Sequence, residues 1–532
     1  MKLNLYQFLS AAIIFVYIGT FFSCVSANEN KENPTPPNIV FIMSDDHGYQ
    51  AISAYGHGLN NTPNIDRIAQ EGALFTRSTV TNSICAPSRA VMLTGMHSFV
   101  NGKVDNVQPF NWDQPNFPKI LQANGYQTAM IGKIHLDGLP QGFDYSMVLP
   151  GQGHYYNPDF IVNGERKRFP GYVTQITTDY ALKWLDEMRD KDKPFCLLYH
   201  QKAPHRNWKP EEKYLTLFDD IEFTPPANYY DDYAGRGTAA HEQEMEIDGH
   251  ARWGHDFKML VNPDGDTTRL ARQLKRFTPE QKEKWLAAYT PKNEAMKAAN
   301  LSGKELAEWK FNRYIKDYLR TIQSVDDGVG EVLDYLDENG LGENTIVVYT
   351  SDQGFYLGEH GWFDKRFMYE ESFRTPLLMR YPKEIKAGTK IDALVQNLDF
   401  APTFLDYAGI QAPEEMQGES FRDVVSGATE TWRDAVYYTY YEYPSVHMVK
   451  RHYGVSTDRY KLIHFYYDID EWELYDLEKD PNEMNSVYGD PAYKEVEQMM
   501  HARLDSIRQY YGDSDANDQR YLKAYLDHRA KR

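Results

Sequence analysis

Four short apolar runs in this 532-residue sequence are each followed by side chains that can bind a metal ion or an anion. The runs are NIVFIMS, QTAMIG, PFCLLYH and TIVVYTS. In chain order, the groups that follow them are Asp45, Asp46, Lys133, His135, Lys202, His205, Asp352 and Gln353. One acidic pair alone is more often a solvated turn, but four such groupings after four runs indicate one shared site.

The acidic members of this set predict a hard cation. Asp45, Asp46, Asp352 and Gln353 offer only oxygen atoms, which are the ligands that Ca²⁺ and Mg²⁺ prefer. Zinc would require closely spaced histidines or cysteines, and the sequence has no such cluster.

The basic members predict an anionic substrate. Arg89, Lys133, His135, His205 and Lys365 supply positive charge, hydrogen-bond donors and protons. An anionic ester repels an attacking oxygen, so a cation with lysine and arginine must cancel that charge, and a histidine must protonate the leaving alcohol.

The elements that must position these groups are those of an α/β fold. Buried parallel strands are predicted at 38–44, 127–132, 194–200, 345–351 and 375–380. Between them lie helical patterns, the clearest of which aligns Ile322, Val325, Val329, Val332 and Leu336 on one face. A mostly parallel sheet covered by helices on both sides follows, and its strands end where ligands bind in such folds.

Composition limits the partners and the compartment. The sequence has 57 Lys and Arg against 77 Asp and Glu, a net charge of −20, which excludes a nucleic-acid partner. Lys2 and the apolar run from 8 to 22 are typical of an export signal, too short for a membrane span. Cleavage is predicted after residue 27, and a lipoprotein-type site at Cys24 is the alternative. We therefore expect an exported protein, periplasmic or at the cell surface, with a lipid anchor as an option.

Only two cysteines, Cys85 and Cys196, lie beyond this signal. Cys196 stands inside an apolar run and is predicted to be a buried small hydrophobe, so no disulfide framework is expected. Cys85 begins CAPSRAVMLTG, where a helix starting near Pro87 would direct its N-terminal dipole at an anion. A thiolate nucleophile is a weak explanation, because thiolate phosphatases place a longer spacer between Cys and Arg than the three residues before Arg89.

The segment Cys85 to Gly95 resembles the signature C-x-P-S-R-x-x-x-L-T-G of the type I sulfatases, in the alkaline phosphatase superfamily. The match is complete at the fixed positions. Further motifs of that family follow in order: SDD at 44–46, GKIH at 132–135, KAPH at 202–205, SDQG at 351–354 and DK at 364–365. The resemblance covers nearly the whole chain after the signal.

The resemblance implies a role for each matching residue. Cys85 would be oxidised to formylglycine by a maturation enzyme, and its hydrate would attack sulfur and later release sulfate by elimination. Arg89 would stabilise the hydrate, His135 would act as the base that reforms the aldehyde, and His205 would protonate the leaving oxygen. Lys133 and Lys365 would bind the sulfate. One Ca²⁺ would be held by Asp45, Asp46, Asp352, Gln353 and an oxygen of the modified Cys85; many relatives have Asn where this chain has Gln353.

Three regions are predicted from these patterns: a signal peptide at 1–27, a catalytic domain at 36–430 and a C-terminal subdomain at 431–532. The subdomain has a four-stranded antiparallel sheet followed by a helix from about 491 to 511. The polar segment 223–301 is expected to be an irregular insertion over the site. The stretch His447 to Gly454 is a candidate rim of the pocket, with a plain exposed turn as the alternative.

The sequence therefore predicts an exported, calcium-dependent sulfatase that acts on sulfated carbohydrate, with the 6-O-sulfate of N-acetylglucosamine in glycosaminoglycans or mucin glycans as the first candidate. Other glycan specificities remain open: 2-O-uronate, galactose and N-sulfo groups. A phosphonate or phosphodiester hydrolase of the same superfamily is a rival, and a glycan-binding protein without catalysis is another.

Overall fold

The computed structural model describes residues 35–259, 274–429 and 431–530. Residues 36–532 form one compact unit. The predicted signal peptide at 1–27 and its alternative site at Cys24 lie outside the described residues. Among the described residues, no helix has the length and apolar character needed to cross a membrane.

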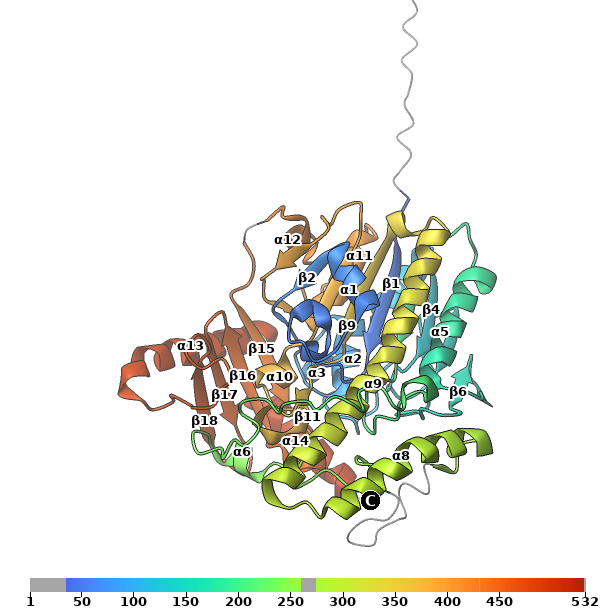
Figure 1. The fold of residues 1–532 in the computed structure, drawn as a ribbon. Helices are drawn as coiled ribbons and strands as arrows, with labels where there is room; N and C mark the ends of the chain where they lie inside the picture. Colours follow the sequence, from blue (N-terminus) through green and yellow to red (C-terminus); the bar gives the residue numbers. More distant parts are fainter. Residues whose placement is uncertain (1–34, 260–273, 430, 531–532) are drawn as a thin grey trace, which may run out of the picture. The chain divides into compact units, whose positions relative to one another are not determined.

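A mixed sheet lies at the centre of the fold (Figure 1). Within the described residues it has ten strands in the order β13-β2-β12-β9-β1-β8-β4-β5-β6-β7. Their bounds are Thr389–Ile391, Ala73–Phe75, Leu377–Arg380, Thr345–Ser351, Asn38–Ser44, Phe195–His200, Gln127–Gly132, Tyr145–Val148, Asp159–Val162 and Glu165–Arg168. The four neighbours β9, β1, β8 and β4 are parallel, so their carboxyl ends meet at one edge.

One predicted strand has the wrong direction. The run at 375–380 forms β12, but β12 is antiparallel to β9 and to β2. An apolar run that is buried on both faces has the same pattern in either direction, so its sequence cannot specify parallel pairing.

Helices cover both faces of the sheet. α1 (Pro63–Gln70), α5 (Val173–Lys183) and α9 (Gly303–Glu338) pack together over one face, where Val40 and Ile42 of β1 point. α2 (Cys85–Thr94), α4 (Phe117–Ala123) and α11 (Phe400–Tyr407) cover the other, where Ile39, Phe41 and Met43 point. The predicted stripe on α9 is fully buried, which confirms the two-sided arrangement.

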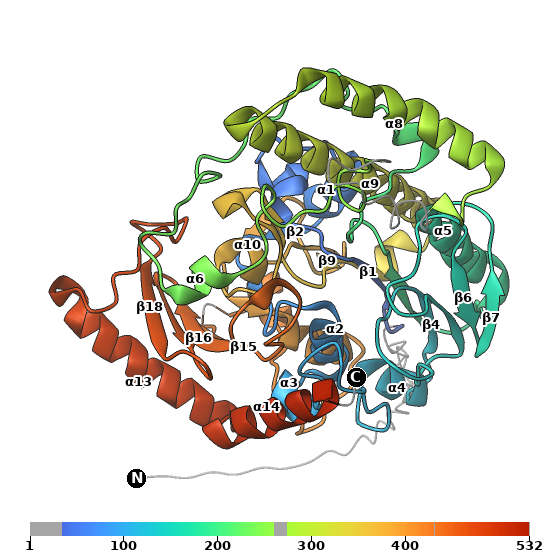
Figure 2. The same ribbon diagram turned by 90° about the horizontal axis from the view of Figure 1, so that it is seen from below.

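A second sheet follows the first in sequence. Its four antiparallel strands are β15 (Ala435–Tyr440), β16 (His452–Thr457), β17 (Tyr460–Phe465) and β18 (Glu471–Asp476), as predicted. α13 (Lys494–Tyr511) packs on this sheet (Figure 2), and α14 (Asp515–Ala530) follows. The sequence predicted α13 but not α14. The predicted domain boundary after residue 430 stays a prediction.

The segment 223–301 is more regular than expected. It contains α6 (Thr238–Glu242) and α8 (Pro279–Ala299), which runs along one flank in Figure 2. The sequence carried a signal for α8, because Thr278 and Gln281 form a capping box at its start. Only four of the residues that follow are buried, so the apolar pattern does not indicate a helix there.

The remaining elements are short. β3 (Ser78–Thr79) pairs with β14 (Val395–Gln396), and β10 (Tyr356–Leu357) pairs with β11 (Phe363–Asp364). The short helices are α3 (Ser98–Asn101), α10 (Glu370–Phe373) and α12 (Arg422–Ser426).

Candidate active site

Three carboxylates meet beyond the carboxyl ends of β1 and β9. Asp45 and Asp46 follow β1 and Asp352 follows β9, and each offers an oxygen atom within 4.8 Å of the others. All three are fully buried. The backbone N–H of Asp46 donates to Asp352 Oδ1 at 3.0 Å, which ties the two strand ends together. Asp46 has a φ of 68°, a backbone strain typical of functional sites.

This cluster fits a hard cation. Asp45 Oδ1, Asp46 Oδ2 and Gln353 Oε1 are buried and have no hydrogen-bond partner among the described residues. Burial, with the charge of Asp45 as the next cause, raises the pKa of Asp352 to about 7. These oxygen atoms stay unpaired although Arg89, Lys133 and Lys365 contact the three carboxylates, and unpaired buried oxygen atoms are what Ca²⁺ or Mg²⁺ would take.

The side-chain amide of Gln353 turns its nitrogen, not its oxygen, toward the carboxylates. Its Nε2 faces Asp46 Oδ1, and its Oε1 is left unpaired. Rotation of the amide by half a turn would exchange the two atoms and present the oxygen.

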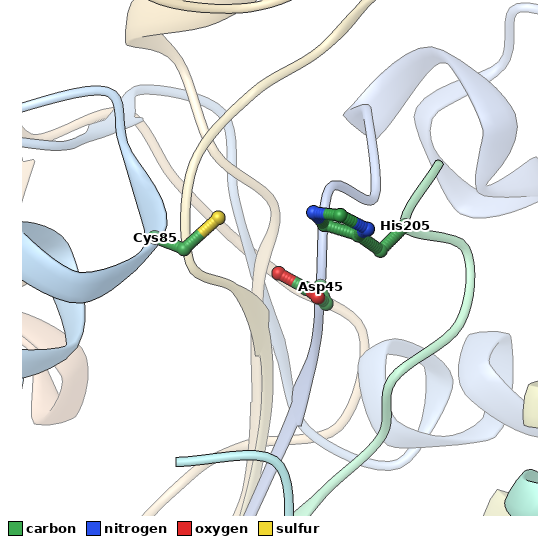
Figure 3. Close-up of side chains that lie close together, drawn as sticks. All are labelled: Asp45, Cys85 and His205. Carbon is green, nitrogen blue, oxygen red and sulfur yellow. The ribbon is translucent and has the colours of Figure 1, made fainter. Parts of the chain in front are cut away.

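Cys85 lies beside this cluster. It is the first residue of α2, not two residues before the helix as predicted, and only 1% of it is exposed. Its Sγ, an oxygen of Asp45 and a ring nitrogen of His205 lie within 4.8 Å of one another (Figure 3). Burial raises the pKa of the Cys85 thiol well above its ordinary value. The side chain is therefore no thiolate, which agrees with the rejection of a thiolate mechanism.

Arg89 is held one turn further along α2. Its Nε donates to Asp352 Oδ2 at 2.9 Å, and Nη2 lies 2.9 Å from the same oxygen. Nη1 donates to the carbonyl of Lys133. This buried fork connects α2, β9 and the end of β4 and fixes the guanidinium at the site.

Two lysines contact the carboxylates. Lys133 Nζ donates to Asp45 Oδ2, and Lys365 Nζ donates to Asp46 Oδ1 at 2.6 Å. Burial acts to raise the pKa of Asp45, but the charges of Lys133, His205 and Arg89 together outweigh it and hold that pKa well below its usual range. Lys365 lies next to Asp364, whose Oδ2 is 3.1 Å from His447 Nε2.

Two histidines complete the set. Tyr155 Oη donates to the backbone carbonyl of His205, and His205 Nδ1 lies 2.5 Å from the carbonyl of Arg206. His205 Nε2 is left facing Asp46 Oδ2 at 3.8 Å. Burial, and then Lys133, lowers the pKa of both His135 and His205, so both rings are neutral in the metal-free site. His135 has a φ of 54° and an unpaired, buried Nδ1.

The structure thus brings every predicted site residue to one place, and it adds groups that the sequence did not reveal. Gln152 Oε1 accepts from Lys133 Nζ, and Asn106 Oδ1 accepts from the backbone N–H of Ala86 at 3.3 Å. Neither belongs to a motif with chemical meaning, and both come from loops. The candidate rim residue His447 is buried and contacts Asp364 and Arg206, so it is part of the site wall.

Acidic and basic side chains gathered at the carboxyl edge of a mostly parallel sheet define the class of α/β enzymes, to which the alkaline phosphatase superfamily belongs. A family model described as Sulfatase matches residues 37–410. A second, described as N-sulphoglucosamine sulphohydrolase, C-terminal, matches residues 358–510. The chain belongs to the sulfatase family, and it is a sulfatase.

Individual relatives agree with this family. The chain is 50% identical over 501 residues to an N-acetylglucosamine-6-O-sulfatase of Bacteroides thetaiotaomicron, covering 92% of this chain and 90% of that protein. A solved structure in complex with its substrate D-glucosamine-2-N,6-O-disulfate has a TM-score of 0.89 and 50% identity, covering 91% of this chain and 100% of the other. A phosphonate monoester hydrolase of Agrobacterium radiobacter has a TM-score of 0.63 at 20% identity, covering 89% and 96%, and shares the fold alone.

Proposed function

We propose that this sulfatase removes the 6-O-sulfate of N-acetylglucosamine or N-sulfoglucosamine in glycosaminoglycans or mucin glycans. The observation that carries the proposal is the 50% identity, over nearly the whole of both chains, to an enzyme named for that activity. The substrate in the related solved structure also carries a 6-O-sulfate.

The cofactors that we propose are one Ca²⁺ and formylglycine at Cys85. Asp45, Asp46, Asp352 and Gln353 would hold the cation, whose positive charge would offset that of the sulfate ester. The hydrated aldehyde would supply the attacking hydroxyl. Because the Cys85 side chain is 1% exposed, the maturation enzyme would have to act before the chain folds.

The neighbouring side chains would then bind the substrate and move its protons. Lys133 and Lys365 supply ammonium groups for the sulfate oxygens, and Arg89 holds the modified side chain in place. The carbonyl of Arg206 can only accept, so Nδ1 of His205 carries a proton. With the anionic substrate bound, the ring would take up a second proton at Nε2 and deliver it from there to the leaving sugar oxygen. His135 would take the proton at the step that releases sulfate.

The proposed localisation is the periplasm or the cell surface, based on the N-terminal sequence. Intact mass of the protein from its native host distinguishes cleavage after residue 27 from lipidation at Cys24. A mature protein that retains residues 1–27 would refute export by either route.

One observation favours a second specificity. The match of residues 358–510 to a C-terminal model named for N-sulphoglucosamine sulphohydrolase makes the N-sulfate an alternative target. A substrate that carries both groups decides between them.

The experiment uses glucosamine 2-N,6-O-disulfate, both monosulfates and N-acetylglucosamine 6-O-sulfate, with the products separated by chromatography. We expect loss of the 6-O-sulfate only. Release of the N-sulfate, or faster turnover of an aryl phosphodiester than of an aryl sulfate, would refute the proposal. Cys85→Ala should abolish turnover, whereas Cys196→Ala, at a buried position in β8, should retain it.

A further inference from the structure

Two buried lysines on the segment that carries His205 have no acidic partner. Lys202 is 3% exposed and Lys209 is 6% exposed. Neither Nζ makes a hydrogen bond or an ion pair with any residue that the structure describes. Each instead lies over an aromatic ring, Lys202 at 4.8 Å from the centre of Tyr155 and Lys209 at 5.6 Å from that of Phe277.

An aromatic wall joins these lysines to the site. Tyr155 Oη donates to the carbonyl of His205 at 2.6 Å, and Tyr172 Oη donates to the carbonyl of Lys209 at 2.9 Å. The rings of Tyr155 and Tyr172 stack with their centres 5.9 Å apart. Lys202 and Lys209 are therefore held by the same wall that positions His205.

The charges around the two lysines support the same placement. Burial lowers the pKa of Lys202 to about 7, with Lys133 acting in the same direction and Asp45 opposing it. Burial also lowers the pKa of Lys209 to about 7, with Lys258 and Lys202 adding to the effect. Lys202 thus lies within electrostatic range of both the reaction centre and Lys209.

Neighbouring cationic side chains are paired with carboxylates, whereas Lys202 and Lys209 are not. Lys258 Nζ lies 3.0 Å from Asp317 Oδ2, and Arg276 Nη2 lies 3.0 Å from Asp159 Oδ1. A buried ammonium without a counter-ion costs free energy, and a bound anion would remove that cost.

We propose that Lys202 and Lys209 form a second anion subsite, which binds an anionic substituent of the glycan other than the sulfate that is removed. The ligand is a sulfate or carboxylate group, either on the same sugar or on the neighbouring one. This inference rests on the proposed function, because it concerns the substrate of that site. It makes the two lysines determinants of specificity for highly sulfated glycans.

The test compares kcat/KM for three 6-O-sulfated substrates. They are N-acetylglucosamine 6-O-sulfate, glucosamine 2-N,6-O-disulfate, and a disaccharide in which a uronate is joined to N-acetylglucosamine 6-O-sulfate. We expect the wild type to prefer a substrate with a second anion. Preference for the disulfate places the anion on the same sugar, and preference for the disaccharide places it on the neighbour. In Lys209→Met this preference should fall by about tenfold, the loss of a charge-assisted hydrogen bond.

Lys310→Met is the matched control. Lys310, in α9, is also buried, but its Nζ pairs with Asp248 Oδ1 at 2.7 Å. It should leave the preference unchanged. Wild-type indifference to the second anion would overturn the inference, as would a preference that survives both Lys202→Met and Lys209→Met.

A second measurement does not depend on turnover. The melting temperature of the wild type should rise more with the disulfate than with the monosulfate, and Lys209→Met should lose that difference. If the wild type hydrolyses no 6-O-sulfate, the proposed function fails, and this shift still decides whether the subsite exists. Equal shifts in the wild type and the variant would refute the subsite.

Discussion

Replacement of Gly132 by alanine should both destabilise the protein and displace Lys133. Gly132 ends β4 with a φ of 113°, and a Cβ atom there would lie 1.8 Å from the carbonyl oxygen of His200 in β8. The positive φ costs about 1–3 kcal/mol for a residue with a side chain. The clash adds roughly 1–3 kcal/mol, because a backbone strand must move. The hydrogen bond from Lys133 N to His200 O, 2.9 Å long, is weakened as well, by about 1 kcal/mol.

The sum is about 3–7 kcal/mol, a large part of the total stability of a folded protein. For a chain of this size the melting temperature falls by roughly 1 °C per kcal/mol, so a decrease of about 3–7 °C is expected, measured by circular dichroism or differential scanning fluorimetry. The loss of activity at a temperature where the variant is still folded should be larger than its loss of stability explains, since Lys133 moves with the strand end.

Gly138→Ala separates backbone strain from the clash. Gly138 has a φ of 84°, but its nearest neighbour would be Trp112 Cδ1 at 3.4 Å, an ordinary contact. Its melting temperature should fall by only about 1–3 °C, which is the strain term alone. If Gly132→Ala proves as stable as Gly138→Ala, the close approach of β4 and β8 carries no energetic weight, and the reasoning fails.

Three further predictions concern the cation and the cysteine. Burial raises the pKa of Asp352 to about 7 and that of Asp46 to about 6. In the metal-free protein the folded state therefore binds protons more tightly than the unfolded state. The free energy of unfolding falls as the pH rises from the ordinary carboxyl pKa of 3.8 to the folded-state value of about 7. Calcium should thus raise the melting temperature more at pH 8 than at pH 5, and the opposite order would contradict the assignment. Gln353→Leu should weaken calcium binding by at least about tenfold in calorimetry, whereas Gln353→Asn retains an amide oxygen; equal affinity for the Leu variant would exclude Gln353 as a ligand. Peptide mass spectrometry of protein from the native host should find an aldehyde at Cys85 and a thiol at Cys196, and an unmodified Cys85 in active enzyme would refute the proposed nucleophile.

The central strands could be predicted because each is buried on both faces. β1, β4 and β9 have the bounds that their apolar runs indicated, and the residues after them meet as expected. The direction of β12 could not be predicted, because a four-residue apolar strand has no polarity in its pattern.

The missed helices have a different cause. α8 buries only Trp285, Tyr289, Asn293 and Met296, and α14 buries only Asp518 and Tyr525 among the residues described. Such polar helices depend on tertiary contacts, which a single sequence does not display. The same limit applies to Gln152 and Lys209, whose proximity to the site depends on how loops are folded.

The second sheet has a consequence for the synthesis of the enzyme. The hydroxyl of Tyr438 in β15 lies 3.2 Å from the backbone nitrogen of Ser83, two residues before Cys85, and also donates to the carbonyl of Arg366. A nascent chain that has emerged only as far as residue 430 lacks this connection between the two segments that flank the pocket. Full activity therefore awaits the last hundred residues, and a premature stop codon in that region should inactivate the enzyme although every motif upstream is intact.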